Sequence, residues 1–179
     1  IGTIIRKKGV FELAHVFNQI IIANPDAMLI LIGSDAADIK TGSVSTFDLV
    51  KTEFSEAALE RVNYLGKIPY SEVQTHIKRA HVCVFPSFAE TLGMVTIESM
   101  ALQKPVVNTS IGWGQELIDD GINGFLPESN EQWIEAFEKL YKNVDMRAKM
   151  GAVGRKLIQS KYCINVTGVK MAHLLRELT

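Results

Sequence analysis

The chain has 179 residues and a formal net charge of −1, with 47% hydrophobic and 22% charged residues, which is enough for one domain with a hydrophobic core. The near-zero charge gives no overall field that would favour nucleic acid or an anionic membrane surface, and no apolar run approaches the roughly 18 residues of a membrane-spanning helix. Cys83 and Cys163 form no C-x-x-C pair, which argues against a disulfide framework or a zinc site and favours a reduced, cytoplasmic setting.

Short apolar runs alternate with longer amphipathic runs in the first part of the chain. The helix after the first basic turn has apolar residues at helical spacing and ends at the Asn24-Pro25 pair. The apolar run that follows is continuous, which predicts a strand buried on both faces. In chain order we expect a strand at residues 1–5, a basic turn at 6–9, a helix at 10–26, a strand at 27–34, and a loop and then a helix at 34–60.

The same alternation continues to the C-terminus. Ser71 is the expected cap of the helix that follows residue 69. The remaining elements are a strand and turn at 61–69, a helix at 70–80, a strand at 81–87, a helix at 91–103, a strand at 105–109, a turn and strand at 116–127, helices at 131–143 and 145–160, and a last segment that ends at residue 179.

This order of elements predicts the fold class. Strands that alternate with helices of about 10 to 15 residues indicate βαβ units and a parallel sheet with both faces covered. We count five to six strands. We therefore expect one doubly wound, Rossmann-like α/β domain over residues 1–179, with a core at about 1–142 and extra C-terminal helices at 143–179. Because the chain starts inside an apolar run without a methionine, we expect it to be a fragment of a longer protein.

Three segments follow predicted strands, at the edge where open parallel sheets bind their ligands. They are residues 6–9, 88–95 and 111–114. The first is basic, and the other two contain glycine near a helix start. A helix N-terminus offers unpaired N–H groups and the positive end of its dipole, so the amides of Gly93, Met94 and Val95 suit a phosphate.

Lys8 adds a positive charge to this predicted anion site. The alternative interpretation is that Gly93 is a packing glycine and the basic turn is only solvated. Two glutamates flank the glycine: Glu90 precedes the helix, and Glu98 lies one to two turns inside it. A carboxylate there can accept hydrogen bonds from sugar hydroxyls, although each glutamate alone is typical of a solvated surface. Trp113 can stack on a sugar or pack into the core.

The stretches FPSFAETLGMVTIESMALQKPVV and GINGFL resemble the C-terminal half of retaining GT-B glycosyltransferases of the group 1 family, which use nucleotide-sugar donors. The similarity runs from about residue 1 to 142. The motifs that carry it are Gly2, Lys8-Gly9, Gly66, Pro86-Ser87, Glu90 to Glu98, Lys104-Pro105-Val106-Val107, Gly112 to Glu116, and Asn123-Gly124-Phe125-Leu126.

This resemblance implies a role for each site residue. Glu98 looks like the glutamate that binds the ribose hydroxyls, and Glu90 like the one that contacts the donor sugar. Lys8 and the Gly93–Val95 amides look like the diphosphate site, and the backbone at Ile68 like the loop that recognises the base. The family usually has an arginine where this chain has Thr3; Arg6 is the candidate replacement at the diphosphate.

The resemblance also implies the reaction: transfer of the sugar with retention of configuration, without a bound metal or other cofactor. Glu90 is either a nucleophile or, in the interpretation that we favour, a positioning group. The acceptor, a glycan or lipid-linked glycan, would bind an N-terminal domain absent from this chain. We therefore expect the isolated domain to bind nucleotide and to transfer little or nothing. The expected setting is polysaccharide or glycolipid biosynthesis in the cytoplasm, at the inner face of the membrane.

Several alternatives stay open. One is a catalytically inactive nucleotide-binding or scaffold domain, which the Thr3 departure favours. Others are a GT-B sugar epimerase or phosphorylase, which the two-glutamate motif and Lys8-Gly9 disfavour. A receiver-like module would need clustered acids after the first strand, where this chain is basic.

Overall fold

The computed structural model describes residues 1–90, 92–112 and 114–177. Within these residues, short strands form two parallel pairs, β1 with β2 and β3 with β4. The strands are β1 (Leu29–Leu31), β2 (Val62–Tyr64), β3 (Cys83–Phe85) and β4 (Val106–Asn108). The α/β class and the parallel direction are those that the sequence predicts.

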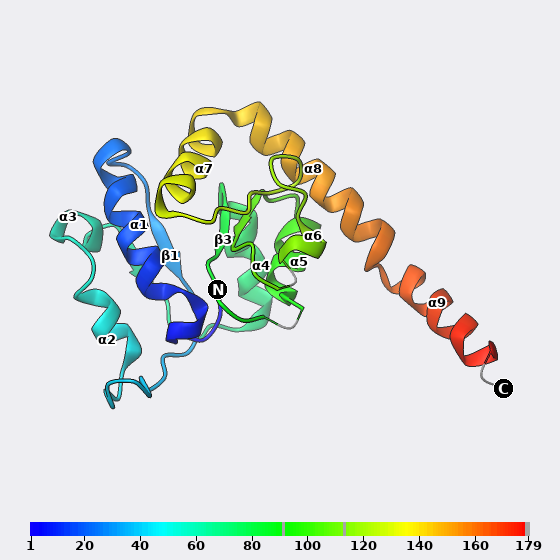
Figure 1. Cartoon of the computed structure of the whole chain (residues 1–179), viewed down its shortest axis with the longest axis horizontal. Helices are drawn as coiled ribbons and strands as arrows, with labels where there is room; N and C mark the ends of the chain where they lie inside the picture. The colour runs from blue at the N-terminus through cyan, green and yellow to red at the C-terminus, as the bar shows by residue number, and fades with distance from the viewer. Residues whose placement is uncertain (91, 113, 178–179) are drawn as a thin grey trace.

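The helices connect the strands and continue beyond them to the C-terminus. In Figure 1, α8 slants away from the strands and α9 extends further in the same direction, so the C-terminus lies far from the N-terminus. The helices are η1 (3-10, Arg6–Lys8), α1 (Val10–Ala23), α2 (Thr46–Lys51), α3 (Glu56–Leu59), α4 (Tyr70–Arg79), α5 (Met94–Ala101), α6 (Gly114–Leu117), α7 (Asn130–Lys142), α8 (Val144–Lys161) and α9 (Ile164–Glu177).

Two predicted strands appear only as isolated bridges. In the N-terminal segment, Ile4 forms a parallel bridge with Asp35, and the N–H of Gly2 donates to the carbonyl of Ile32 at 2.8 Å. Next to β4, Phe125 forms a parallel bridge with Val107. Each pair of strands is thus extended by one short segment. The predicted five to six regular strands are therefore too many for the described residues.

The two faces of β4 pack into different hydrophobic clusters. Val106 and Val107 are both fully buried. Val107 joins the cluster built around α1 and α7, and Val106 joins the cluster built around α4, α5 and α8. Because successive side chains of a strand point to opposite faces, helices cover both sides here, as in a doubly wound fold. In β1, however, Ile30 is 41% exposed, so the prediction of burial on both faces is wrong for that strand.

Side-chain caps begin four of the helices, and the predicted cap of α4 is wrong. In the capped helices a side-chain oxygen accepts a hydrogen bond from a backbone N–H of the first turn. The caps are Ser45 for α2, Ser55 for α3, Ser129 for α7 and Asn143 for α8. α4 begins at Tyr70 instead, with Pro69 as the residue before it, and this places Ser71 inside the first turn.

An ion pair ties the loop between β1 and α2 to the first turn of the chain. The guanidinium of Arg6 donates two hydrogen bonds to the buried carboxylate of Asp38, at 2.7 and 3.0 Å, and lies 4.1 Å from the ring centre of Phe11. Thr41 adds hydrogen bonds from its hydroxyl and its N–H. The hydrogen bonds from Arg6, and then those from Thr41, hold the pKa of Asp38 well below its usual range.

α8 docks on α5 through a glycine. A Cβ at Gly151 would lie 2.1 Å from the carbonyl oxygen of Gln103, the residue after the C-cap of α5. A Cβ at Gly168, in α9, would meet no atom of the described residues within 4 Å beyond the nearby backbone of its own helix. Both residues are glycines within helices, but only Gly151 is packed closely against another part of the chain.

We predict opposite effects of alanine at these two positions. Gly151→Ala should lower the free energy of unfolding by about 1–3 kcal/mol, because the helix must move away from the backbone at Gln103. Gly168→Ala should leave it unchanged or raise it by up to about 1 kcal/mol through helix propensity. Urea unfolding followed by circular dichroism measures both. Equal effects of the two substitutions would contradict this account of α8 docking.

We also predict an acid-dependent contribution from Asp38. Its pKa in the folded chain lies below the ordinary value of 3.8, so the folded state binds fewer protons than the unfolded state in acid. The stability that ionised Asp38 provides is present above about pH 4 and is lost as the pH falls further. Asp38→Asn should therefore unfold at lower urea than the wild type at pH 7, and the gap should narrow between pH 4 and 2.5. Asp26→Asn, at an exposed position, controls for the lost charge; a constant gap would contradict the prediction.

Candidate functional site

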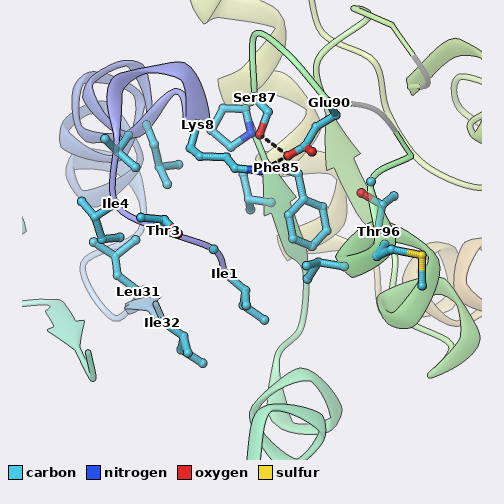
Figure 2. Close-up of a pocket in the computed structure, with 18 of the residues that line it drawn as sticks. Ile1, Thr3, Ile4, Lys8, Leu31, Ile32, Phe85, Ser87, Glu90 and Thr96 are labelled. Carbon is cyan, nitrogen blue, oxygen red and sulfur yellow. Dashed lines mark hydrogen bonds and ion pairs between the residues drawn. The ribbon is translucent and has the colours of Figure 1, made fainter. Parts of the chain in front are cut away.

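A pocket opens between the N-terminal segment and the loop that follows β3. Its volume is about 260 Å³. Figure 2 shows apolar side chains of both segments along its walls, with Lys8, Ser87 and Glu90 gathered at one end. The start of α5, from Gly93 to Thr96, completes the lining. The pocket thus brings together two of the three segments at which the sequence predicts ligand binding.

A close backbone contact holds these two segments together. Gly9 has a φ of +68°, and a Cβ there would lie 1.9 Å from the carbonyl oxygen of Pro86. Next to it, the N–H of Phe88 donates to the carbonyl of Lys7 at 2.8 Å. Only glycine tolerates both this conformation and this approach. The contact fixes the basic turn beside the loop that carries Glu90.

Lys8 and Glu90 form an ion pair as a consequence. The ammonium of Lys8 contacts one oxygen of the Glu90 carboxylate, and the hydroxyl of Ser87 donates to that oxygen at 3.1 Å. About a quarter of each charged side chain is exposed, 26% for Lys8 and 28% for Glu90. Among the described residues that line the pocket, Lys8 has the only basic side chain. A small anion that enters can reach it.

The start of α5 faces the same space. Gly93 is the N-cap, with left-handed φ and ψ of 60° and 50°. A Cβ there would meet the Thr96 hydroxyl at 3.4 Å, an ordinary contact. The glycine therefore serves the backbone conformation and not close packing, so the packing-glycine alternative is wrong. The first N–H groups of a helix lack intrahelical acceptors, and Gly93, Met94 and Val95, at the start of α5, line the pocket.

Glu98 lies outside the lining of this pocket and has its own partner. The hydroxyl of Tyr70, the first residue of α4, donates to Glu98 Oε1 at 2.7 Å. This hydrogen bond to a carboxylate is the main cause that raises the pKa of Tyr70. The sequence analysis missed Tyr70. The feature that could have indicated Tyr70 is its position directly after the Gly66–Pro69 turn, at the carboxyl end of β2.

Ile68 lies on the turn between β2 and α4. Its side chain packs against the hydrophobic cluster around α4, α5 and α8. Gly66, with a φ of +65°, accepts a hydrogen bond from the N–H of Gly33 at 2.8 Å and so ties this turn to the residues after β1. The turn leads directly to Tyr70 and thus lies on the Glu98 side of the site.

Arg6 lies away from the pocket, whereas Thr3 lies in its lining. The guanidinium of Arg6 is engaged by Asp38, and Arg6 is not among the residues that line the pocket. Thr3 lines the pocket and is exposed. Thus the described structure brings Lys8, and not Arg6, to the glycine-led start of α5.

The third predicted segment reaches the same site. A Cβ at Gly112 would lie 3.6 Å from the carbonyl oxygen of Glu90, so the loop after β4 runs beside the Glu90 loop. The predicted roles of Trp113 concern a residue outside the described part of the chain. In that described part, no group of three or more His, Cys, Asp or Glu side chains is arranged to hold a metal ion, and no helix is long and apolar enough to cross a membrane.

Comparison with known proteins gives consistent matches along the chain. The family described as glycosyl transferases group 1 matches residues 1–157. The capsular polysaccharide biosynthesis glycosyltransferase CapM of Staphylococcus aureus is 28% identical over 165 residues, which are 90% of this chain and 41% of CapM.

Solved structures share the fold. Sucrose-phosphate synthase from Thermosynechococcus elongatus superposes with a TM-score of 0.81 at 24% identity, over 99% of this chain and 45% of that one. Anabaena HepE, solved in complex with UDP, gives 0.81 at 20% identity, over 98% and 48%. The chain spans less than half the length of each of these three proteins. Since the family match covers most of its residues, the chain belongs to the group 1 glycosyl transferases, and its fold is that of a Rossmann-like domain of GT-B enzymes.

Proposed function

We propose that this chain binds the nucleoside diphosphate sugar donor of a glycosyltransferase. The observation that carries the proposal is the convergence of Lys8 and the glycine-led N-terminus of α5 beside Glu90. A cation and unpaired amides together suit a diphosphate. The UDP bound in HepE, a protein of similar fold, supports the same class of ligand.

In this proposal the nucleotide runs from the pocket toward α4. The diphosphate contacts Lys8 and the amides of Gly93, Met94 and Val95. Glu98, in the second turn of α5, accepts hydrogen bonds from the ribose, and the backbone at Ile68 contacts the base. The order of diphosphate, ribose and base is supported by the chain itself, because the Ile68 turn leads into Tyr70 and Tyr70 contacts Glu98.

The sugar then lies near Glu90, at the opposite end of the diphosphate. We assign Glu90 the positioning role, because its carboxylate is already held by Lys8 and Ser87. The bond between the sugar and the diphosphate oxygen breaks as an acceptor hydroxyl forms its bond on the same face, with retention of configuration, and the proton of that hydroxyl passes to the departing diphosphate oxygen. Lys8 and the α5 amides stabilise the charge on the leaving diphosphate, so the proposed reaction requires no metal ion.

Transfer to an acceptor is proposed for a longer protein. The relatives that match are more than twice as long as the matched region, which leaves room for a second domain that binds the acceptor. CapM acts in capsular polysaccharide biosynthesis, and an acceptor glycan or lipid-linked glycan fits that setting. On this proposal the chain alone binds donor and transfers little or no sugar.

We predict that one of UDP, GDP and ADP binds the chain, and that Glu98→Gln weakens this binding by about tenfold or more through loss of charged hydrogen bonds to the ribose. Isothermal titration calorimetry measures the affinities. Glu56→Gln, at an exposed position on α3, is the control and should bind as the wild type does. If none of the three binds at millimolar concentration, the proposed function is contradicted.

The Lys8–Glu90 ion pair predicts opposite signs for its two members. Lys8→Met should weaken binding of the same nucleoside diphosphate by about tenfold, because a charged contact is lost. Glu90→Gln should strengthen it by about fivefold, because it frees Lys8 and removes a negative charge near the diphosphate. Titration at two salt concentrations checks the electrostatic origin. Weaker binding by both variants would contradict the assigned arrangement.

A further inference from the structure

The hydrogen bond between Tyr70 and Glu98 is not explained by packing. Tyr70 is 63% exposed, so its ring contributes little to a hydrophobic core. It stands at the first position of α4, where Pro69 sets the helix start without a side-chain cap. Yet its hydroxyl is held 2.7 Å from Glu98 Oε1, on a different helix and 28 residues away. An exposed pair of this kind adds little to stability, which points to a role in binding.

The topology brings the two side chains to one edge of the fold. α4 follows β2 and α5 follows β3, and the strands are parallel within their pairs. Both helices therefore start at the carboxyl ends of strands, the edge at which such folds bind ligands. Tyr70 opens α4, and Glu98 lies in the second turn of α5. They meet between the predicted base turn at Ile68 and the amides at Gly93.

We propose that Tyr70 and Glu98 form a paired ribose site, in which each accepts a hydrogen bond from one of the two vicinal ribose hydroxyls. This inference rests on the proposed function and extends it by a residue that the family motif does not contain. The phenolic hydroxyl donates its hydrogen to Glu98, and its lone pairs remain free to accept one. Oε2 of Glu98 is left for the second ribose hydroxyl.

The charge state of Tyr70 suits this role. Its contact with Glu98 raises the pKa of the phenol above the ordinary value of 10.0, so Tyr70 stays protonated at neutral pH and keeps its hydrogen bond to the carboxylate. A protonated phenol also places no negative charge beside the nucleotide. The pair thus presents two acceptor sites with a single negative charge, which matches a neutral diol.

The test is calorimetric titration of wild type, Tyr70→Phe and Glu98→Gln with the best binder of UDP, GDP and ADP, and with its 2′-deoxy and 3′-deoxy forms. The wild type should prefer the ribose form over each deoxy form by about tenfold. Tyr70→Phe should bind the ribose form about tenfold more weakly and lose its preference over one deoxy form. Glu98→Gln should lose its preference over the other.

Tyr141→Phe is the matched control, because Tyr141 is an exposed tyrosine on α7 that is not among the residues lining the pocket; it should keep the wild-type affinities. The urea midpoint of Tyr70→Phe should equal that of the wild type, whereas a merely structural role would lower the midpoint and leave the deoxy preferences intact. If the wild type binds but Tyr70→Phe keeps both preferences, this inference is overturned and the proposed function stands. If the wild type binds no nucleoside diphosphate, both are overturned.

Discussion

The candidate site depends on the contact between Gly9 and Pro86. A Cβ at Gly9 would lie 1.9 Å from the Pro86 carbonyl oxygen, so the two backbones touch. Because parallel strands end at one edge, the turn after the N-terminal segment and the loop after β3 already lie near each other. Because Gly9 has no side chain, nothing separates the two backbones at this point. Lys8 on one side of the contact can then reach Glu90 on the other, and the space beside them becomes the pocket at the start of α5.

The helices were predictable where local signals and amphipathic spacing agree. α1 ends at Ala23, with Asn24 as its C-cap directly before Pro25, and α7 begins after the Ser129 cap. The sheet was less predictable. We predicted strands in residues 1–5 and 116–127, yet these segments form only isolated bridges, because regular pairing depends on partners far away in sequence. The prediction of Ser71 as a helix cap was also wrong. Serine is a good capping residue, but α4 begins two residues earlier than that cap implies, directly after Pro69.

Motif order predicted which loops approach one another, but not which side chains pair. Lys8 and Glu90 are 82 residues apart, and their approach follows from strands that end at one edge. Tyr70 escaped notice because no motif distinguishes it from other tyrosines at helix starts; only the placement of α4 beside α5 gives it Glu98. For Arg6, the sequence suggested a ligand contact that the structure replaces with a contact inside the protein. Its position in a basic turn suggests an anion ligand, but a buried carboxylate from the next loop, Asp38, takes its guanidinium.

The site therefore holds both glutamates in satisfied side-chain pairs. Glu90 is neutralised by Lys8, and Glu98 accepts from a neutral phenol. These pairs have different consequences for a diphosphate nucleotide. In the proposed complex, Lys8 divides its charge between Glu90 and the phosphates; on that proposal the division reduces affinity for the nucleotide and keeps Glu90 in place for the sugar. Tyr70 and Glu98 need no such exchange, because both keep free acceptor positions. A preformed pair loses little side-chain entropy on binding. In the proposed complex, the ribose end therefore offers acceptors that need no rearrangement, whereas the phosphate end has to give up part of an existing ion pair.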